Sequence, residues 1–150
     1  MRKKKNIIII SLIFFLTNCG FVPVYLNNTD VNFSIEQISF LGDRELNNFL
    51  KTNLDKYKNN KSNNKIFVET QSEYRKIVLS KDGAGKVTNY QLEVEVIFLI
   101  KPENKEIKIT EKKIMDSLAD KFEEARYERT MKQNFASSIS NKLASELIIY

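Results

Sequence analysis

Cys19 is the residue whose type and position are best suited to chemistry, because it is the single cysteine in a chain of 150 residues. One thiol cannot form an internal disulfide or a cysteine-rich zinc site. The chain has no histidine, which removes imidazole acid–base catalysis and histidine metal ligation. A lone thiol can also be an ordinary buried core residue. The residues that precede it favour covalent modification instead.

A basic and then apolar segment leads directly to Cys19. Residues 2–5 are Arg-Lys-Lys-Lys, and the ten residues 7–16 are almost entirely apolar. This order is typical of a secretory signal, and a permanent membrane helix would need about 20 apolar residues. The alternative is a membrane-spanning helix, which would require the apolar segment to extend through residues 21–24. The ending Leu-Thr-Asn-Cys at 16–19 resembles a bacterial lipobox, in which the cysteine is lipidated and becomes the first mature residue.

These features predict three parts along the chain: a lipoprotein signal peptide at 1–18, a lipidated N-terminus and tether at 19–30, and a single periplasmic domain at 31–150. The formal charge is +5, but the signal peptide holds four of the 24 basic residues and none of the 19 acidic ones. The mature chain is therefore nearly neutral, and nucleic acid is not an expected partner. Gly20, where an Asp would favour inner-membrane retention, favours the outer membrane.

The first part of the predicted domain is a strand followed by a helix. Residues 31–40 alternate in polarity, with a change of phase that a β-bulge near Glu36 and Gln37 would accommodate. A helix begins after Asp43, a suitable N-cap. Residues 58–65 are polar and asparagine-rich, as in a loop. The helix carries one apolar stripe, made of Leu46, Phe49, Leu50, Leu54 and Tyr57.

Three strands and a long helix are predicted after this loop. Turns rich in Gly or containing Pro, at 81–86 and 102–105, join the strands into two hairpins. Residues 120–147 contain no Gly or Pro, and from Met131 to Leu147 apolar side chains recur every four positions, so we expect a helix that packs its later turns on the sheet. The three strands are residues 66–79, 87–101 and 106–115.

The order β-α-β-β-β-α predicts an α+β fold, with a four-stranded, mostly antiparallel sheet and two helices packed on one face. This arrangement buries both apolar helix stripes. The other face carries Thr, Ser, Glu and Gln, and it could meet solvent or a partner.

Six basic residues in the strands and turns are candidates for contact with an anionic partner: Arg75, Lys76, Lys81, Lys86, Lys112 and Lys113. Lysine suits phosphate as a point charge, although each of the six also fits an ordinary solvated position. Glu93 and Glu95 alternate on one strand with no base, nucleophile or metal ligand near them in the sequence. We interpret them as solvated or interface residues, and we predict no catalytic residue, no metal site and no cofactor.

The seven residues from Cys19 to Tyr25, Cys-Gly-Phe-Val-Pro-Val-Tyr, resemble the mature N-terminus of the lipopolysaccharide-assembly lipoproteins, the LptE (RlpB) family, in its alphaproteobacterial form. The order of the predicted elements and the helix opening from Asp43 to Leu50 are also similar to that family. Besides the cysteine, the motif is carried by Gly20, Phe21, Pro23 and Tyr25.

This resemblance implies a protein that is not an enzyme and that is lipid-anchored on the periplasmic side of the outer membrane. Members of the family act as plug and assembly partner of the β-barrel LptD and assist the passage of lipopolysaccharide to the cell surface. The resemblance therefore implies two partners, an LptD-like barrel and lipopolysaccharide, that the six basic residues could contact. The alternative is a generic lipid-anchored periplasmic binding or adaptor domain unrelated to the barrel.

Overall fold

A computed structural model describes residues 31–58 and 62–148, and these form the predicted α+β fold. The order β-α-β-β-β-α is confirmed, with one 3₁₀ turn, Asp55–Tyr57, added after the first helix. The elements are β1 (Ser34–Gly42), α2 (Arg44–Leu54), β2 (Lys65–Lys81), β3 (Val87–Lys101), β4 (Lys105–Asp116) and α3 (Lys121–Ile148). Within these described residues, neither helix is long and apolar enough to cross a membrane.

The four strands lie in the order β1-β2-β3-β4. β1 and β2 are parallel, because α2 returns the chain to the end of the sheet at which β1 began. The two predicted hairpins make the other two pairs antiparallel. The sheet is therefore mixed and mostly antiparallel, as expected.

β1 confirms the predicted bulge, because its register against β2 shifts between Ile35 and Gln37. The strand occupies Ser34–Gly42 rather than the predicted residues 31–40. It continues because Gly42 still pairs with Ser72, and its positive φ of 100° then turns the chain towards α2. Asp43 caps that helix as predicted, since its Oδ1 accepts a hydrogen bond of 2.7 Å from the Leu46 N–H.

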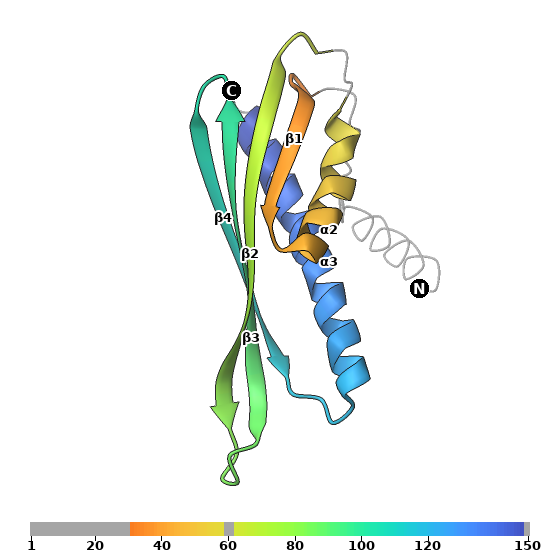
Figure 1. Cartoon of the computed structure of the whole chain (residues 1–150), viewed down its shortest axis with the longest axis vertical. Coiled ribbons are helices and arrows are strands. Elements are labelled where there is room, and N and C mark those ends of the chain that lie inside the picture. Colours follow the sequence, from red (N-terminus) through yellow and green to blue (C-terminus); the bar gives the residue numbers. More distant parts are fainter. Residues whose placement is uncertain (1–30, 59–61, 149–150) are drawn as a thin grey trace, which may run out of the picture.

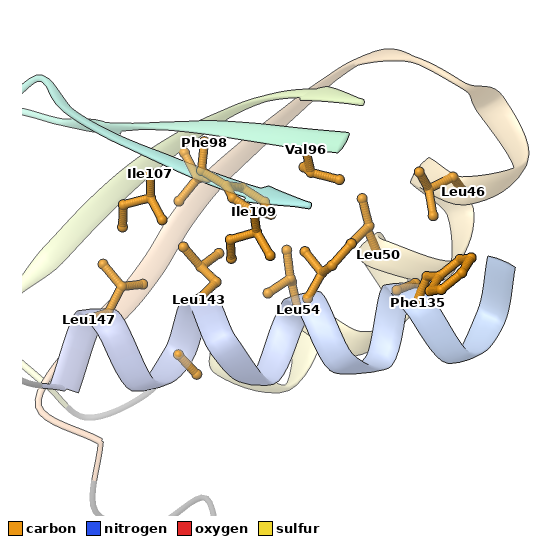
Figure 2. Close-up of a cluster of buried hydrophobic side chains, with 14 of the residues drawn as sticks. Leu46, Leu50, Leu54, Val96, Phe98, Ile107, Ile109, Phe135, Leu143 and Leu147 are labelled. Carbon is orange, nitrogen blue, oxygen red and sulfur yellow. The ribbon is translucent and has the colours of Figure 1, made fainter. Parts of the chain in front are cut away.

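Both helices cover the same face of the sheet, and the core lies between the two layers (Figure 1). Figure 2 shows how leucines from α2 and α3 point towards aliphatic and aromatic residues of β3 and β4. Leu50, Leu143 and Phe98 are completely buried there. The predicted apolar stripe of α2 and the later turns of α3 therefore form the core.

The first half of α3 is held to the rest of the domain by charges as well as by apolar contacts. Lys132 is buried, and its Nζ lies 3.4 Å from Asp43 Oδ2 and 3.1 Å from Glu45 Oε2, next to the start of α2. The same ammonium group lies 4.2 Å from the ring centroid of Tyr74 in β2. Burial and the nearby Glu128 carboxylate raise the pKa of Tyr74, so its hydroxyl stays protonated.

Candidate partner-binding surface

The predicted N-terminal site lies outside the described residues. Cys19 and the four motif residues Gly20, Phe21, Pro23 and Tyr25 all precede Val31, where the description begins. Lipidation of Cys19 and the division of the chain into signal peptide, tether and domain therefore stay predictions.

Arg75 and Lys112 lie on the face of the sheet opposite the helices, on either side of Glu93. The Arg75 guanidinium donates to Glu93 Oε1, and Lys112 Nζ lies 3.0 Å from Glu93 Oε2. Hydrogen bonds from Lys112 and then Arg75 hold the pKa of Glu93 below its usual range. The three residues are cross-strand neighbours in β2, β3 and β4, so two of the six candidate cations already have an anionic partner.

Lys76 points to the helix side and joins β2 to α3. Its Nζ lies 3.0 Å from a carboxylate oxygen of Glu124 and 3.0 Å from one of Glu128. The ammonium group also lies 4.3 Å from the ring centroid of Tyr90. Burial lowers the pKa of Lys76, but the hydrogen bonds to Glu128 and Glu124 outweigh this and raise it. Lys76 is therefore engaged in holding the domain together.

Glu124 is a buried carboxylate at the start of α3 that organises the link from β4. It accepts hydrogen bonds from Lys121 Nζ at 2.9 Å, from Lys76 Nζ at 3.0 Å and from the Leu118 N–H at 3.0 Å. These donors, Lys121 first, lower the pKa of Glu124 to about 2. The carboxylate is thus ionised at any physiological pH, which suits a structural ion pair and not an acid–base catalyst.

Lys81 and Lys86 lie at the tip of the β2–β3 hairpin, which extends beyond the helices at the lower end of Figure 1. Asp82 builds this turn, because its Oδ1 accepts the N–H groups of Ala84 and Lys86 at 2.9 Å each. Gly85 supplies a positive φ of 82°. We refer to residues 77–86 as the hairpin tip.

Three of the six candidate cations, Lys81, Lys86 and Lys113, have no carboxylate within 4.0 Å among the described residues. Lys113 pairs with Leu92 across β3 and β4, in the half of the sheet that leads towards the tip. The three candidate cations that have no such partner therefore lie towards one end of the molecule.

Exposed apolar side chains gather at this same end, a feature that the sequence interpretation missed. Ile77, Val78 and Leu79 are 39–47% exposed in β2, and Ile114 of β4 is 62% exposed. At the start of α3, Phe122 is 74% exposed. These three consecutive apolar residues interrupt the alternation of β2. The interruption is the sequence feature from which an exposed apolar surface could have been predicted.

The carboxylates do not assemble into a reactive group. Glu93 is paired as described above, and Glu95 forms an ion pair of 2.9 Å with Lys108. No group of acidic or cysteine residues suited to a metal ion occurs in the described ranges 31–58 and 62–148. Glu93 and Glu95 are therefore both engaged in ion pairs with basic neighbours.

No protein-family model matches this sequence, and neither does any curated protein sequence. Solved structures are similar in fold. The rare lipoprotein B of Shewanella oneidensis superposes with a TM-score of 0.55 at 18% identity, over 74% of this chain and 96% of that one.

An uncharacterised lipoprotein B from Nitrosomonas europaea has a TM-score of 0.56 at 16% identity, covering 79% of this chain and 86% of that one. A minor lipoprotein of Acinetobacter baumannii gives 0.50 at 18% identity, with coverages of 74% and 92%. The chain thus has the fold of rare lipoprotein B, and these three structural neighbours are lipoproteins.

Proposed function

We propose that this chain is a lipoprotein of the LptE (RlpB) family, of the alphaproteobacterial type, anchored through Cys19 on the periplasmic side of the outer membrane. The observation that carries the proposal is the rare lipoprotein B fold, shared over most of the chain. The Cys-Gly-Phe-Val-Pro-Val-Tyr segment at 19–25 supports it independently, because this resemblance is one of sequence and the segment lies outside the described residues. The chain acts in this proposal as plug and assembly partner of an LptD-like β-barrel.

The surface chemistry of the hairpin tip supports a role with lipopolysaccharide, an anionic amphiphile. Lys81 and Lys86 offer point charges to lipid A phosphates. Ile77 and Leu79, next to them along β2, offer aliphatic contacts to acyl chains. Arg75, Lys76 and Lys112 would have to leave internal carboxylates to do the same, which makes them weaker candidates.

A pull-down tests the proposal. The affinity-tagged full chain is purified from detergent-solubilised membranes, and the recovered proteins are identified by mass spectrometry. We expect a large β-barrel protein in stoichiometric amounts, and depletion of the chain should reduce lipopolysaccharide at the cell surface. Recovery of no barrel, together with normal surface lipopolysaccharide, would contradict the translocon role and favour a generic periplasmic adaptor.

A further inference from the structure

The two halves of α3 present different chemistry to the sheet. In the later turns, from Phe135 to Leu147, the buried residues are mostly apolar. In residues 121–131, which we call the charged segment, the one buried residue is Glu124, and Glu128 follows it one turn later on the same side. Met131 is the one apolar side chain of this segment that packs against the core.

Ion pairs make the contact between the charged segment and β2. Lys76 Nζ lies 3.0 Å from a carboxylate oxygen of Glu124 and 3.0 Å from one of Glu128. The side chains of Lys76 and Glu128 are still 26% and 22% exposed, so water can replace each partner when the two separate. Such a pair adds little net stability, because the cost of desolvating the charges offsets their attraction. The apolar burial of the later turns carries no such offset.

An apolar strip of the sheet lies beside these ion pairs. Leu92 is the cross-strand neighbour of Lys76 and is completely buried. Two residues back along β3, Tyr90 pairs with Met115, which is 4% exposed. Tyr90 also pairs with Val78 in β2, which is 45% exposed because the hairpin extends past the start of α3 (Figure 1). The strip therefore runs from the covered part of the sheet to the hairpin tip.

The edge of the charged segment is not sealed. A hollow of about 190 Å³ lies where the end of β4 meets α3, and its lining includes Met115, Leu118 and Tyr127. Met115 thus belongs both to the covered strip and to the wall of a surface hollow. A small outward movement of the charged segment would join the two.

We propose that the charged segment is a lid, which moves away from the sheet while the later turns of α3 stay packed on the core. The ion pairs of Lys76 hold the lid closed. Lys132 binds the start of α2 and marks the point at which the two halves part. Opening releases Lys76 and exposes Leu92 and Met115, and it needs less free energy than global unfolding because few apolar contacts are lost. The lid is a property of the domain and does not depend on the proposed function.

Cysteine labelling detects the open form. Leu92→Cys places a thiol under the lid, and Val96→Cys places one on the same face of β3 in the apolar core (Figure 2), where both native side chains are completely buried. The full chain of each variant, in detergent, is treated with N-ethylmaleimide, and peptide mass spectrometry counts label at these positions separately from Cys19. We expect labelling at position 92 to be about tenfold faster than at position 96. Equal rates would overturn the lid.

Two further changes, each made in the Leu92→Cys and Val96→Cys chains, should shift the labelling in opposite directions. Lys76→Leu leaves Glu128 without its cation, so labelling at position 92 should rise by about tenfold. Lys76→Leu/Glu128→Leu replaces the pair with two apolar side chains and should bring the rate back to that of the parent chain or below it. The matched control is Lys142→Leu, which removes an ion pair of the later turns, with Glu111 of β4, and should leave position 92 unchanged.

The distribution of the label decides between a lid and general loosening. In Lys76→Leu, an equal rise at positions 92 and 96 would indicate global unfolding and would overturn the lid, and so would an unchanged rate at position 92. Circular dichroism melting verifies that each variant is folded. If Lys76→Leu does not fold, the comparison of positions 92 and 96 without it still decides the question. Failure to recover a barrel in the pull-down would overturn the proposed function and leave the lid standing.

Discussion

At the scale of single residues, the structure divides the six candidate cations into two kinds. Arg75, Lys76 and Lys112 each bind carboxylates inside the protein. Lys81, Lys86 and Lys113 have no such partner in the described part of the chain and lie towards the hairpin tip. Residue type alone could not make this division, because lysines of both kinds occupy similar positions along the strands.

Glu124 gives a prediction at this scale, because its single carboxylate accepts hydrogen bonds from four donors. Its pKa in the folded protein, about 2, is below the ordinary 4.5, so its ionised form stabilises the fold fully above pH 4.5. That contribution is lost as the pH falls from about 4.5 to about 2. We expect Glu124→Gln to lower the free energy of unfolding by roughly 1–3 kcal/mol at pH 7, and by progressively less towards pH 2.

Urea unfolding at a series of pH values measures this difference. Glu123→Gln is the matched control, because the neighbouring side chain is half exposed and its ion pair, 3.5 Å long, is with the exposed Arg126. The control should change stability by less than about 0.5 kcal/mol at every pH. Parallel pH profiles for wild type and Glu124→Gln would contradict the assigned role.

At the scale of elements, the junction between β1 and α2 depends on one glycine. Gly42 has a φ of +100°, and a Cβ at this position would lie 1.8 Å from the Ser72 carbonyl oxygen. We expect Gly42→Ala to destabilise the protein by about 2 kcal/mol or more, because both the backbone conformation and the strand contact oppose a side chain. Gly83→Ala, where the added Cβ meets nothing within 4 Å, should cost less than about 0.5 kcal/mol. Thermal melting of both variants tests this, and equal losses would contradict it.

The hairpin tip is the element that we expect to contact lipopolysaccharide. Lys81→Glu/Lys86→Glu reverses two charges that have no internal partner in the described residues, so binding should fall by about tenfold or more while the melting temperature changes little. Arg44→Glu/Lys51→Glu makes the same change in net charge on the exposed side of α2 and should keep near-wild-type binding. Binding to purified lipopolysaccharide at two salt concentrations measures the effect. An equal loss in both variants would indicate a response to net charge rather than a site.

At the scale of the whole molecule, the described chain has two unlike ends. It begins at Val31 near the N-terminal end of β1, where Phe33 is buried in the core. The hairpin tip lies at the opposite end of the sheet (Figure 1). A chain anchored by residue 19 and folded in this way would present its tip far from the point where the folded domain begins.

The anchor itself gives the prediction at this scale. If Cys19 is lipidated, Cys19→Ala should move the protein from the membrane fraction to the soluble periplasmic fraction or leave the signal uncleaved, since three acyl chains hold a lipoprotein at the membrane. The melting temperature of the domain should not change, because residue 19 lies outside the described fold. Mass spectrometry of the wild-type N-terminus is the direct measurement, and an unmodified Cys19 still joined to residues 1–18 would contradict the prediction.

Much of the fold could be predicted because the signals were local. The alternation in β3 predicted residues 87–101, the bounds that the strand has. Asp43 predicted the start of α2, and the change of phase at Glu36 and Gln37 predicted the bulge in β1. Each of these signals depends on side-chain periodicity or capping within a few residues, so the sequence determined them without knowledge of the rest of the chain.

Only the tertiary structure decided which charges and surfaces remain available. Lys76 pairs with Glu124 and Glu128, which lie 48 and 52 residues later in the sequence. Arg75 pairs with Glu93 across a hairpin whose strand register includes two irregularities. No local pattern encodes such partners, because they depend on how strands and helices pack together. The same packing places both helices on one side of the sheet and leaves its other face uncovered. The sequence by itself determined the elements and the predicted anchor, and the tertiary structure determined the surfaces that a partner can reach.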